Sequence, residues 1–333
     1  MNIFSWQIND FHQLAQRLAS LPHALLFKGP AGIGKRAFAR AVAQGLLCEK
    51  RSAPLTACGT CGACHWFETE NHPDFRMLQP EIAESNDSGD NSEPSDKKKN
   101  RYISIAQVRS LTDFINISAH RNGHKIVLIQ PAEAMNVNAA NALLKNLEEP
   151  PPNMHFLLVS DRPNMLPATI RSRCQQLALR PPTAQEATLW LAKSGSAQPE
   201  LALAQTGGAP LLAAELDTAE YWLSRQQFLD GLTSRTFDPL VLAERFATQP
   251  IPQMVNWLQR WSYDLASISF SQRLRYNPDR KDALISAVKR MKTIEILRFH
   301  RELVRFQRIV NHPLNPRLLL EDLLLRYGQL MRN

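Results

Sequence analysis

The sequence has no apolar run long enough to cross a lipid bilayer and no secretory signal at its start. A membrane-spanning helix needs about 18 or more consecutive apolar residues, and the 333 residues contain no such stretch. The first residues, MNIFSW, lack the basic segment and apolar core that direct secretion. Both absences argue against a membrane or secreted protein, so we expect a cytoplasmic one.

Charge of one sign is only slightly in excess. Lys and Arg number 39 against 31 Asp and Glu, which gives a net charge of +8. An anionic partner would suit this balance, but the excess is small and scattered, so an ordinary basic protein fits nearly as well. With 44% hydrophobic residues, the chain can bury a large core and form about two or three domains.

Cysteine is scarce, yet four of the five cysteines lie close together in the sequence. They are Cys48, Cys58, Cys61 and Cys64. Because disulfides are rare in reducing compartments, this clustering indicates a metal site. Four thiolates suit a closed, structural Zn²⁺ site, in which His65 or His72 could replace one ligand. A redox pair, inert buried thiols and an iron-sulfur centre are the alternatives.

Residues 29–35, GPAGIGK, have the pattern of a phosphate-binding loop, and we call them the phosphate loop. In such loops the glycine N–H groups surround phosphates and the lysine reaches the terminal ones. The candidate nucleotide contacts are Gly29, Gly32, Gly34 and Lys35. An apolar run at 23–27 precedes the loop, and helical spacing follows it over 36–47. Nucleotide binding could therefore survive.

The two usual positions for magnesium ligands are both altered. The loop lysine is followed by Arg36 instead of Ser or Thr, and the apolar strand predicted over 125–129 runs into Gln130-Pro131 instead of acidic residues. Hydrolysis needs the metal and a polarised water. We therefore expect no intrinsic ATPase activity, and a role as partner or scaffold for a nucleotide site on another chain.

Apolar periodicity divides the chain into two halves. Strands are predicted over 23–27, 126–129 and 155–159, alternating with helices, which implies a mostly parallel sheet. One of these helices begins at Ser104, where Gln107 completes a capping box. Residues 84–100 are acidic, then basic, with almost no apolar side chains, and are predicted to be a disordered insertion. After residue 182 the pattern is helical to the end.

Three segments resemble bacterial clamp-loader subunits of the AAA+ class. They are residues 141–151 (NALLKNLEEPP), 166–174 (LPATIRSRC) and 315–326 (NPRLLLEDLLLR). A cysteine cluster after the phosphate-loop helix is also a feature of that family. Its working ATPases keep Ser or Thr after the lysine and an Asp-Glu pair at 130–131, so this chain is most similar to a non-catalytic member. The last segment would begin a helix, with Asn315 as its cap and Pro316 as its first residue.

The resemblance covers essentially the whole chain and implies its architecture. It implies an α/β AAA+ domain with a P-loop NTPase-like parallel sheet over 1–178, including the cysteine module at 48–64 and the insertion at 84–100. A small helical lid domain over 179–222 and an all-α collar domain over 223–333 would follow.

The resemblance also implies roles for single residues. In the family, the arginine of the Ser-Arg-Cys motif reaches ATP bound by the neighbouring subunit, and here that residue is Arg173. Such an arginine finger is a planar, always charged donor that stabilises charge on the transferred phosphoryl group. Ser160 or Asp161 would occupy the first sensor position. Leu211 would replace the arginine of the second sensor.

The implied function is that of a non-catalytic clamp-loader subunit of DNA polymerase III. Its partners would be the ATPase subunits tau or gamma and the delta subunit in a ring of five, with the sliding clamp and primed DNA reached through the complex. The chain would belong to a DNA-directed DNA polymerase by association alone. Two alternatives are an autonomous AAA+ ATPase and a zinc-containing DNA-binding protein, although basic residues of the second half are dispersed over helices.

Overall fold

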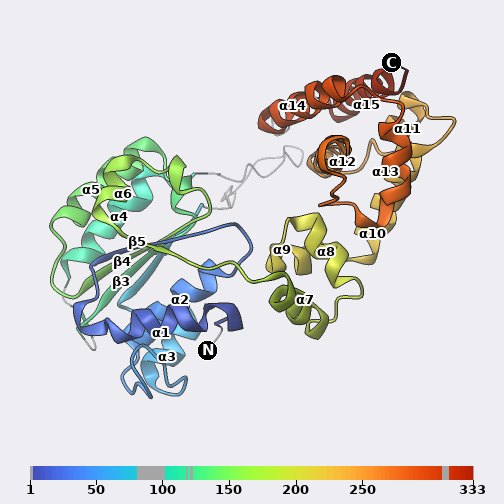
Figure 1. Cartoon of the computed structure of the whole chain (residues 1–333). Helices are drawn as coiled ribbons and strands as arrows, with labels where there is room; N and C mark the ends of the chain where they lie inside the picture. Colours follow the sequence, from blue (N-terminus) through green and yellow to red (C-terminus); the bar gives the residue numbers. More distant parts are fainter. Residues whose placement is uncertain (1–2, 81–101, 118, 121–122, 310–314, 333) are drawn as a thin grey trace, which may run out of the picture. The chain divides into compact units, whose positions relative to one another are not determined.

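The computed structural model describes residues 3–80, 102–117, 119–120, 123–309 and 315–332. The insertion predicted at 84–100 lies outside the described residues. The chain divides into two compact units, Met1–Pro182 and Thr183–Asn333. Each is described separately (Figure 1).

The first unit is built on a five-stranded parallel sheet. Its strands are β1 (Ala24–Lys28), β2 (Phe75–Leu78), β3 (Lys125–Ile129), β4 (Met154–Ser160) and β5 (Gln175–Ala178). Their order across the sheet is β2-β3-β4-β1-β5, and every neighbouring pair is parallel. The expected α/β class is confirmed. The three central strands match the predicted ones, whereas β2 and β5, four-residue strands at the two edges, are not predicted by the sequence pattern.

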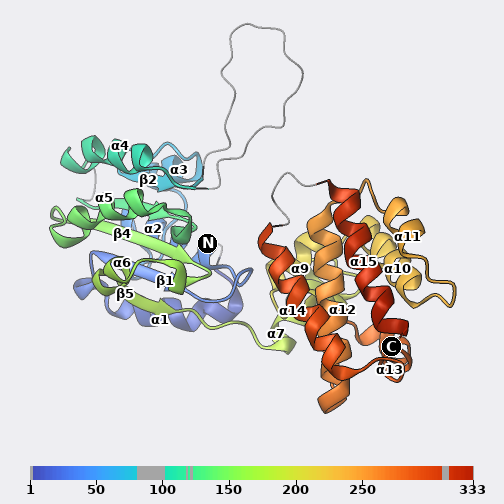
Figure 2. The same ribbon diagram turned by 90° about the horizontal axis from the view of Figure 1, so that it is seen from above.

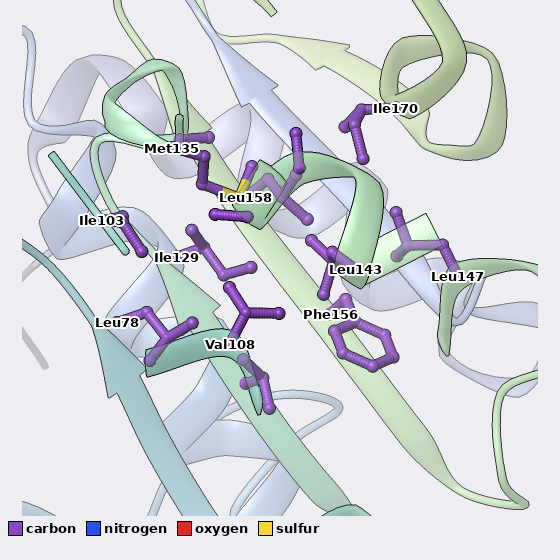
Figure 3. Packing of buried hydrophobic residues seen from close by; sticks show 14 of the residues in the cluster. Leu78, Ile103, Val108, Ile129, Met135, Leu143, Leu147, Phe156, Leu158 and Ile170 are labelled. Carbon is purple, nitrogen blue, oxygen red and sulfur yellow. The ribbon is translucent and has the colours of Figure 1, made fainter. Parts of the chain in front are cut away.

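Helices cover both faces of this sheet (Figure 1). One layer holds α1 (Ile8–Gln16) and α2 (Lys35–Leu47), with α3 (Gly62–Glu68) against α2, and the other holds α4 (Ile105–Asn116), α5 (Val137–Glu148) and α6 (Ala168–Arg173). Successive strand residues point to opposite faces, so each strand contributes to both cores. Leu26 and Phe156 pack beneath α4 and α5, whereas Leu25 and Leu157 pack against α1 and α2. Figure 3 shows the first of these two cores.

The second unit is helical throughout its described residues, as expected. Its helices are α7 (Ala184–Lys193), α8 (Pro199–Thr206), α9 (Pro210–Leu216), α10 (Ala219–Thr233), α11 (Pro239–Arg245), α12 (Ile251–Ser271), α13 (Lys281–Val288), α14 (Thr293–Ile309) and α15 (Pro316–Arg332). Figure 2 shows α12, α14 and α15 side by side. Trp257 and Trp261 of α12 are buried, and the Trp261 indole donates to the Tyr327 hydroxyl at 3.0 Å.

Two predicted helix starts are confirmed by their hydrogen bonds. The Ser104 hydroxyl accepts from the Gln107 N–H at 3.3 Å, and the Gln107 side chain accepts from the Ser104 N–H at 2.8 Å. The Asn315 side chain accepts from the N–H of Arg317 at 3.0 Å, where α15 begins. Among the described residues, none of the helices has the length and apolar character to cross a membrane.

Candidate nucleotide site and cysteine cluster

The phosphate loop connects the carboxyl end of β1 to the first turn of α2. Gly32 and Gly34 have φ angles of 71° and 93°, in the left-handed region that favours glycine. Gly34 is the residue before the helix, and Lys35 is its first residue. Arg36 is exposed on α2. The backbone thus keeps the shape of a phosphate-binding loop.

The Lys35 ammonium is already paired within the chain. Its Nζ lies 2.5 Å from a carboxylate oxygen of Asp161, and the lysine side chain is only 3% exposed. The same ammonium donates to the Pro30 carbonyl in the loop. Asp161 directly follows β4, one of the two positions expected for the first sensor. A phosphate group would have to compete with this carboxylate for the lysine.

Residues at the amino end of the described chain cover the same loop. The Trp6 indole and the Gln7 amide each donate to the Ile33 carbonyl at 3.0 Å. The Phe4 ring stacks on Trp6 with a centroid distance of 4.8 Å. A β-carbon at Gly34 would meet the Phe4 ring at 2.4 Å. The loop is therefore in close contact with the chain's own aromatic side chains.

The edge of the sheet beside the loop offers few free carboxylates for a metal. Gln130, which follows β3, is buried, and its amide donates to the Met77 sulfur at 3.5 Å. Glu133, which the sequence analysis did not identify, accepts from the N–H groups of Asp161 and Arg162 at 2.9 and 3.1 Å. Its carboxylate therefore fixes the turn that presents Asp161 to Lys35. Ser160, the other first-sensor candidate, is buried.

Arg173 is the last residue of α6 and is half-buried, with 35% of its side chain exposed. Its guanidinium forms an ion pair with Glu148 at the end of α5 and donates to the Thr169 carbonyl at 3.0 Å. Both contacts hold the side chain in one direction. Leu211 lies in α9 of the second unit and is half-buried.

The four clustered cysteines converge in space as predicted. All four sulfur atoms lie within 4.8 Å of one another, and two of the pairs are 3.9 and 4.0 Å apart. A tetrahedral zinc with bonds of about 2.3 Å separates its sulfur ligands by about 3.8 Å. The two printed separations are close to this value, and the upper limit of 4.8 Å is within a small side-chain adjustment of it, so the thiols suit a four-coordinate metal. Neither His65 nor His72 belongs to the group.

Backbone N–H groups point at two of these sulfurs. The N–H of Cys58 donates to the Cys48 sulfur, and the N–H groups of Thr60 and Cys61 donate to the Cys58 sulfur at 3.5 and 3.4 Å. The bond from Thr60 is the main reason that the pKa of Cys58 falls to about 6. Burial raises the pKa of Cys48 and Cys64. A bound cation would oppose that effect by stabilising the thiolates.

The cysteine cluster is attached to α2 through a close backbone contact. A β-carbon at Gly45 of α2 would lie 1.9 Å from the carbonyl oxygen of Leu55. Leu55 is fully buried and has a φ of 60°. Glycine at position 45 therefore lets the loop between the first two cysteines pack directly on the helix that follows the phosphate loop.

Comparisons with known proteins identify the family. The family model described as "DNA polymerase III, delta subunit" matches residues 6–183, and the model "DNA polymerase III, delta subunit, C terminal" matches residues 219–329. The DNA polymerase III subunit delta' of Pseudomonas aeruginosa is 40% identical over 268 residues, which are 78% of this chain and 76% of that protein. The chain belongs to the delta-prime family of DNA polymerase III.

Two further similarities are weaker, the first in coverage and the second in identity. The DNA polymerase III subunit tau of Escherichia coli is 34% identical over 163 residues, 49% of this chain and 22% of that protein. A solved gamma subunit-related protein of DNA polymerase III from Thermotoga maritima covers 97% of this chain and 99% of its own, at 17% identity and a TM-score of 0.44. The expected resemblance to clamp-loader subunits is confirmed by membership of the delta-prime family.

Proposed function

We propose that the chain is a non-catalytic clamp-loader subunit that lends Arg173 to ATP bound by a neighbouring subunit. It would act in the cytoplasm, in a ring of five with tau or gamma and delta subunits. The ring would place the sliding clamp on primed DNA. Membership of the delta-prime family supports the clamp-loader role. The contacts of the Lys35 and Arg173 side chains support an inactive site in this chain and a contribution to the site of a neighbour.

The observation that carries the proposal is the ion pair between Lys35 and Asp161. In a working site, this lysine is available to the terminal phosphates of the nucleotide. Here the positive charge of Lys35 is paired with the Asp161 carboxylate, and the negative charge of Asp161 would repel a bound triphosphate. Arg36 also cannot ligate magnesium, and Gln130 lacks the negative charge of the usual acidic ligand. In this proposal the chain therefore contributes no ATP hydrolysis of its own.

Arg173 is well placed to contact a nucleotide bound by another chain, because its side chain is held in one position and is still partly exposed. The contacts to Glu148 and the Thr169 carbonyl restrict the guanidinium, so less side-chain entropy is lost when it binds phosphate oxygens. A phosphoryl group carrying more negative charge would compete with Glu148 for the guanidinium. In this proposal Glu148 positions the finger until the neighbouring nucleotide engages it.

We propose that Cys48, Cys58, Cys61 and Cys64 hold one structural zinc ion. Four thiolates leave no open coordination position, so the ion would supply folding energy and no reaction chemistry. Cys48 directly follows α2, Cys58 and Cys61 precede α3, and Cys64 lies in the first turn of α3. The ion would therefore tie the start of α3 to the helix behind the phosphate loop.

The non-catalytic role is tested on the isolated chain. We expect ATP with magnesium to give no hydrolysis above background, with or without DNA, because the metal ligands are missing. The measurement is phosphate release by the purified protein beside a Lys35→Ala preparation. Metal-dependent turnover that disappears in Lys35→Ala would contradict the proposal.

A further inference from the structure

The second unit contains a polar cavity of about 300 Å³ that the clamp-loader role does not explain. It lies among α8, α12 and α14, and α12 and α14 pack side by side (Figure 2). Its lining includes Gln205, Asn256, Arg260, Tyr263 and His300. None of the described residues that line it is acidic.

Arg260 brings a positive charge to this cavity, and its partners there are neutral. Its guanidinium donates to the Gln205 side-chain oxygen and to the Tyr221 hydroxyl, both at 3.2 Å. Among the described residues no carboxylate forms an ion pair with it. Neutral acceptors satisfy some N–H groups but do not cancel the charge, and a half-buried cation gains most from an anion.

A second guanidinium lies at the rim. Arg275 packs over the rings of Tyr263 and Tyr276, 6.0 and 5.3 Å from their centroids. A β-carbon at Gly207 would be 3.7 Å from its Nη2 atom. The buried Asp264 carboxylate accepts from the backbone N–H groups of residues 275, 276 and 277. The Arg275 guanidinium also hydrogen-bonds to Tyr263, and this bond, with the nearby Asp264 charge, raises the pKa of Arg275. Arg275 therefore adds positive charge at the rim, partly offset by Asp264, and we treat it as a secondary contributor.

The remaining polar groups around the cavity include one further donor whose partner oxygen is already engaged. The Asn256 oxygen accepts from the Gln307 amide at 3.3 Å, which leaves its NH₂ group for a ligand. The Ser262 hydroxyl donates to the Gln259 carbonyl at 3.0 Å, so His300 Nδ1 donates to Ser262 at 2.8 Å. Burial lowers the pKa of His300, and in the neutral ring Nε2 is an acceptor that turns into a donor only on protonation. A cavity that is lined by one guanidinium and one amide NH₂ group, has a second guanidinium near its rim and contains no acidic lining residue has the chemistry of an anion site.

We propose that this cavity binds a phosphoryl group, with Arg260 as its main ligand, Asn256 as a second donor and Arg275 near the rim. The forked guanidinium matches phosphate oxygens. A volume of about 300 Å³ admits one or two phosphoryl groups with a small substituent. The group could come from a small phosphorylated molecule or from the backbone of a nucleic acid.

The test uses the full chain and inorganic pyrophosphate in titration calorimetry at low ionic strength. Arg260→Gln should weaken binding roughly tenfold or more, because one charge-assisted contact is lost. Asn256→Asp should weaken it at least as much, because it places a negative charge in the cavity without changing the side-chain shape. Arg301→Gln is the matched control, since it removes the same charge from an exposed position on α14 that does not line the cavity.

Further measurements distinguish the two sources of the phosphoryl group, and they distinguish this cavity from the phosphate loop as the binding site. Displacement of pyrophosphate by deoxyadenylate supports a small-molecule ligand, and displacement by a short single-stranded oligonucleotide alone supports a nucleic-acid backbone. Absence of saturable binding up to about 10 mM overturns the proposal. Equal weakening by Arg260→Gln and Arg301→Gln overturns it as well. Loss of binding in Lys35→Ala with retention in Arg260→Gln would place the anion on the phosphate loop and also overturn it.

Discussion

Lys35 of the phosphate loop and Arg173 belong to the same unit, yet their charged side chains have opposite surroundings. Lys35 is 3% exposed and is paired with Asp161, and its loop is covered by Phe4, Trp6 and Gln7. Arg173 is 35% exposed and paired with Glu148 at a helix end. One cation is enclosed by its own chain, and the other remains partly available to another molecule.

Under the proposed function, this difference explains how the fold would keep the shape of a nucleotide site without its chemistry. The phosphate loop still connects β1 to α2 and holds their packing, so selection for the fold alone can preserve its glycines. An arginine that acts on another chain needs exposure and a fixed direction, which the end of α6 and Glu148 provide. The two sites can therefore diverge without a change in the sheet.

Loss of the proposed metal should give the largest effect on the segment that packs against α2, the helix that follows the phosphate loop. Cys61→Ser should remove about one bound zinc per chain and destabilise the segment around it by more than about 3 kcal/mol. Elemental analysis and protease sensitivity of the purified protein measure both. Cys174→Ser is the control, because this buried thiol lies outside the cluster. Iron in place of zinc would contradict the account, and so would unchanged metal content in Cys61→Ser.

Gly45→Ala should damage the same region without touching a ligand. The added methyl group would lie 1.9 Å from the Leu55 carbonyl oxygen, so the loop must move, at a cost of roughly 1–3 kcal/mol. Gly195→Ala is the control: its φ is 91°, no atom lies within 4 Å of the added carbon, and it belongs to the second unit, which holds none of the cysteines, so only a backbone cost of about 1 kcal/mol applies. Thermal denaturation that shows equal losses for both variants would refute the packing argument.

The sequence predicts elements and motifs better than the contacts between them. The central strands, the capping box at Ser104 and the cysteine cluster all follow from local spacing. The edge strand β5 escapes prediction because Gln175 and Gln176 are polar and exposed, and their pairing with β1 is decided by the fold. The ion pairs of Lys35 and Arg173 join residues 126 and 25 positions apart in the chain, and no local pattern reports such partners.

Glu148→Gln should give a moderate effect that sharpens the description of Arg173. The change removes a contact that directs the guanidinium but also a competitor for it, so the two effects partly offset each other. Because exposed ion pairs are worth about 0.2–1 kcal/mol, ATP hydrolysis by the reassembled complex should fall by less than about fivefold, and by less than for Arg173→Ala. Glu149→Gln is the control, since Glu149 is exposed and forms no ion pair among the described residues. A loss as large for Glu149→Gln would show that general charge, and not positioning, is responsible.

Lys35→Ala should give the smallest effect. If the phosphate loop is inactive, the complex containing this variant should hydrolyse ATP and load clamps at the wild-type rate, because no nucleotide contact is lost. The Asp161 side chain is 42% exposed and can be solvated when its partner is removed. A clear fall in either rate would mean that the phosphate loop takes part in ATP hydrolysis or clamp loading. The contrast drawn between Lys35 and Arg173 would then be wrong.

The most direct test of the account is Arg173→Ala in a complex assembled with wild-type partners. Assembly should be unaffected, while ATP hydrolysis stimulated by DNA and the clamp should fall, because one neighbouring site loses a charge placed against the developing phosphate charge. Arg173→Lys should restore little, since an ammonium does not reproduce the forked donor. Unchanged hydrolysis and clamp loading in an intact complex would contradict the account and leave Arg173 with a structural role only.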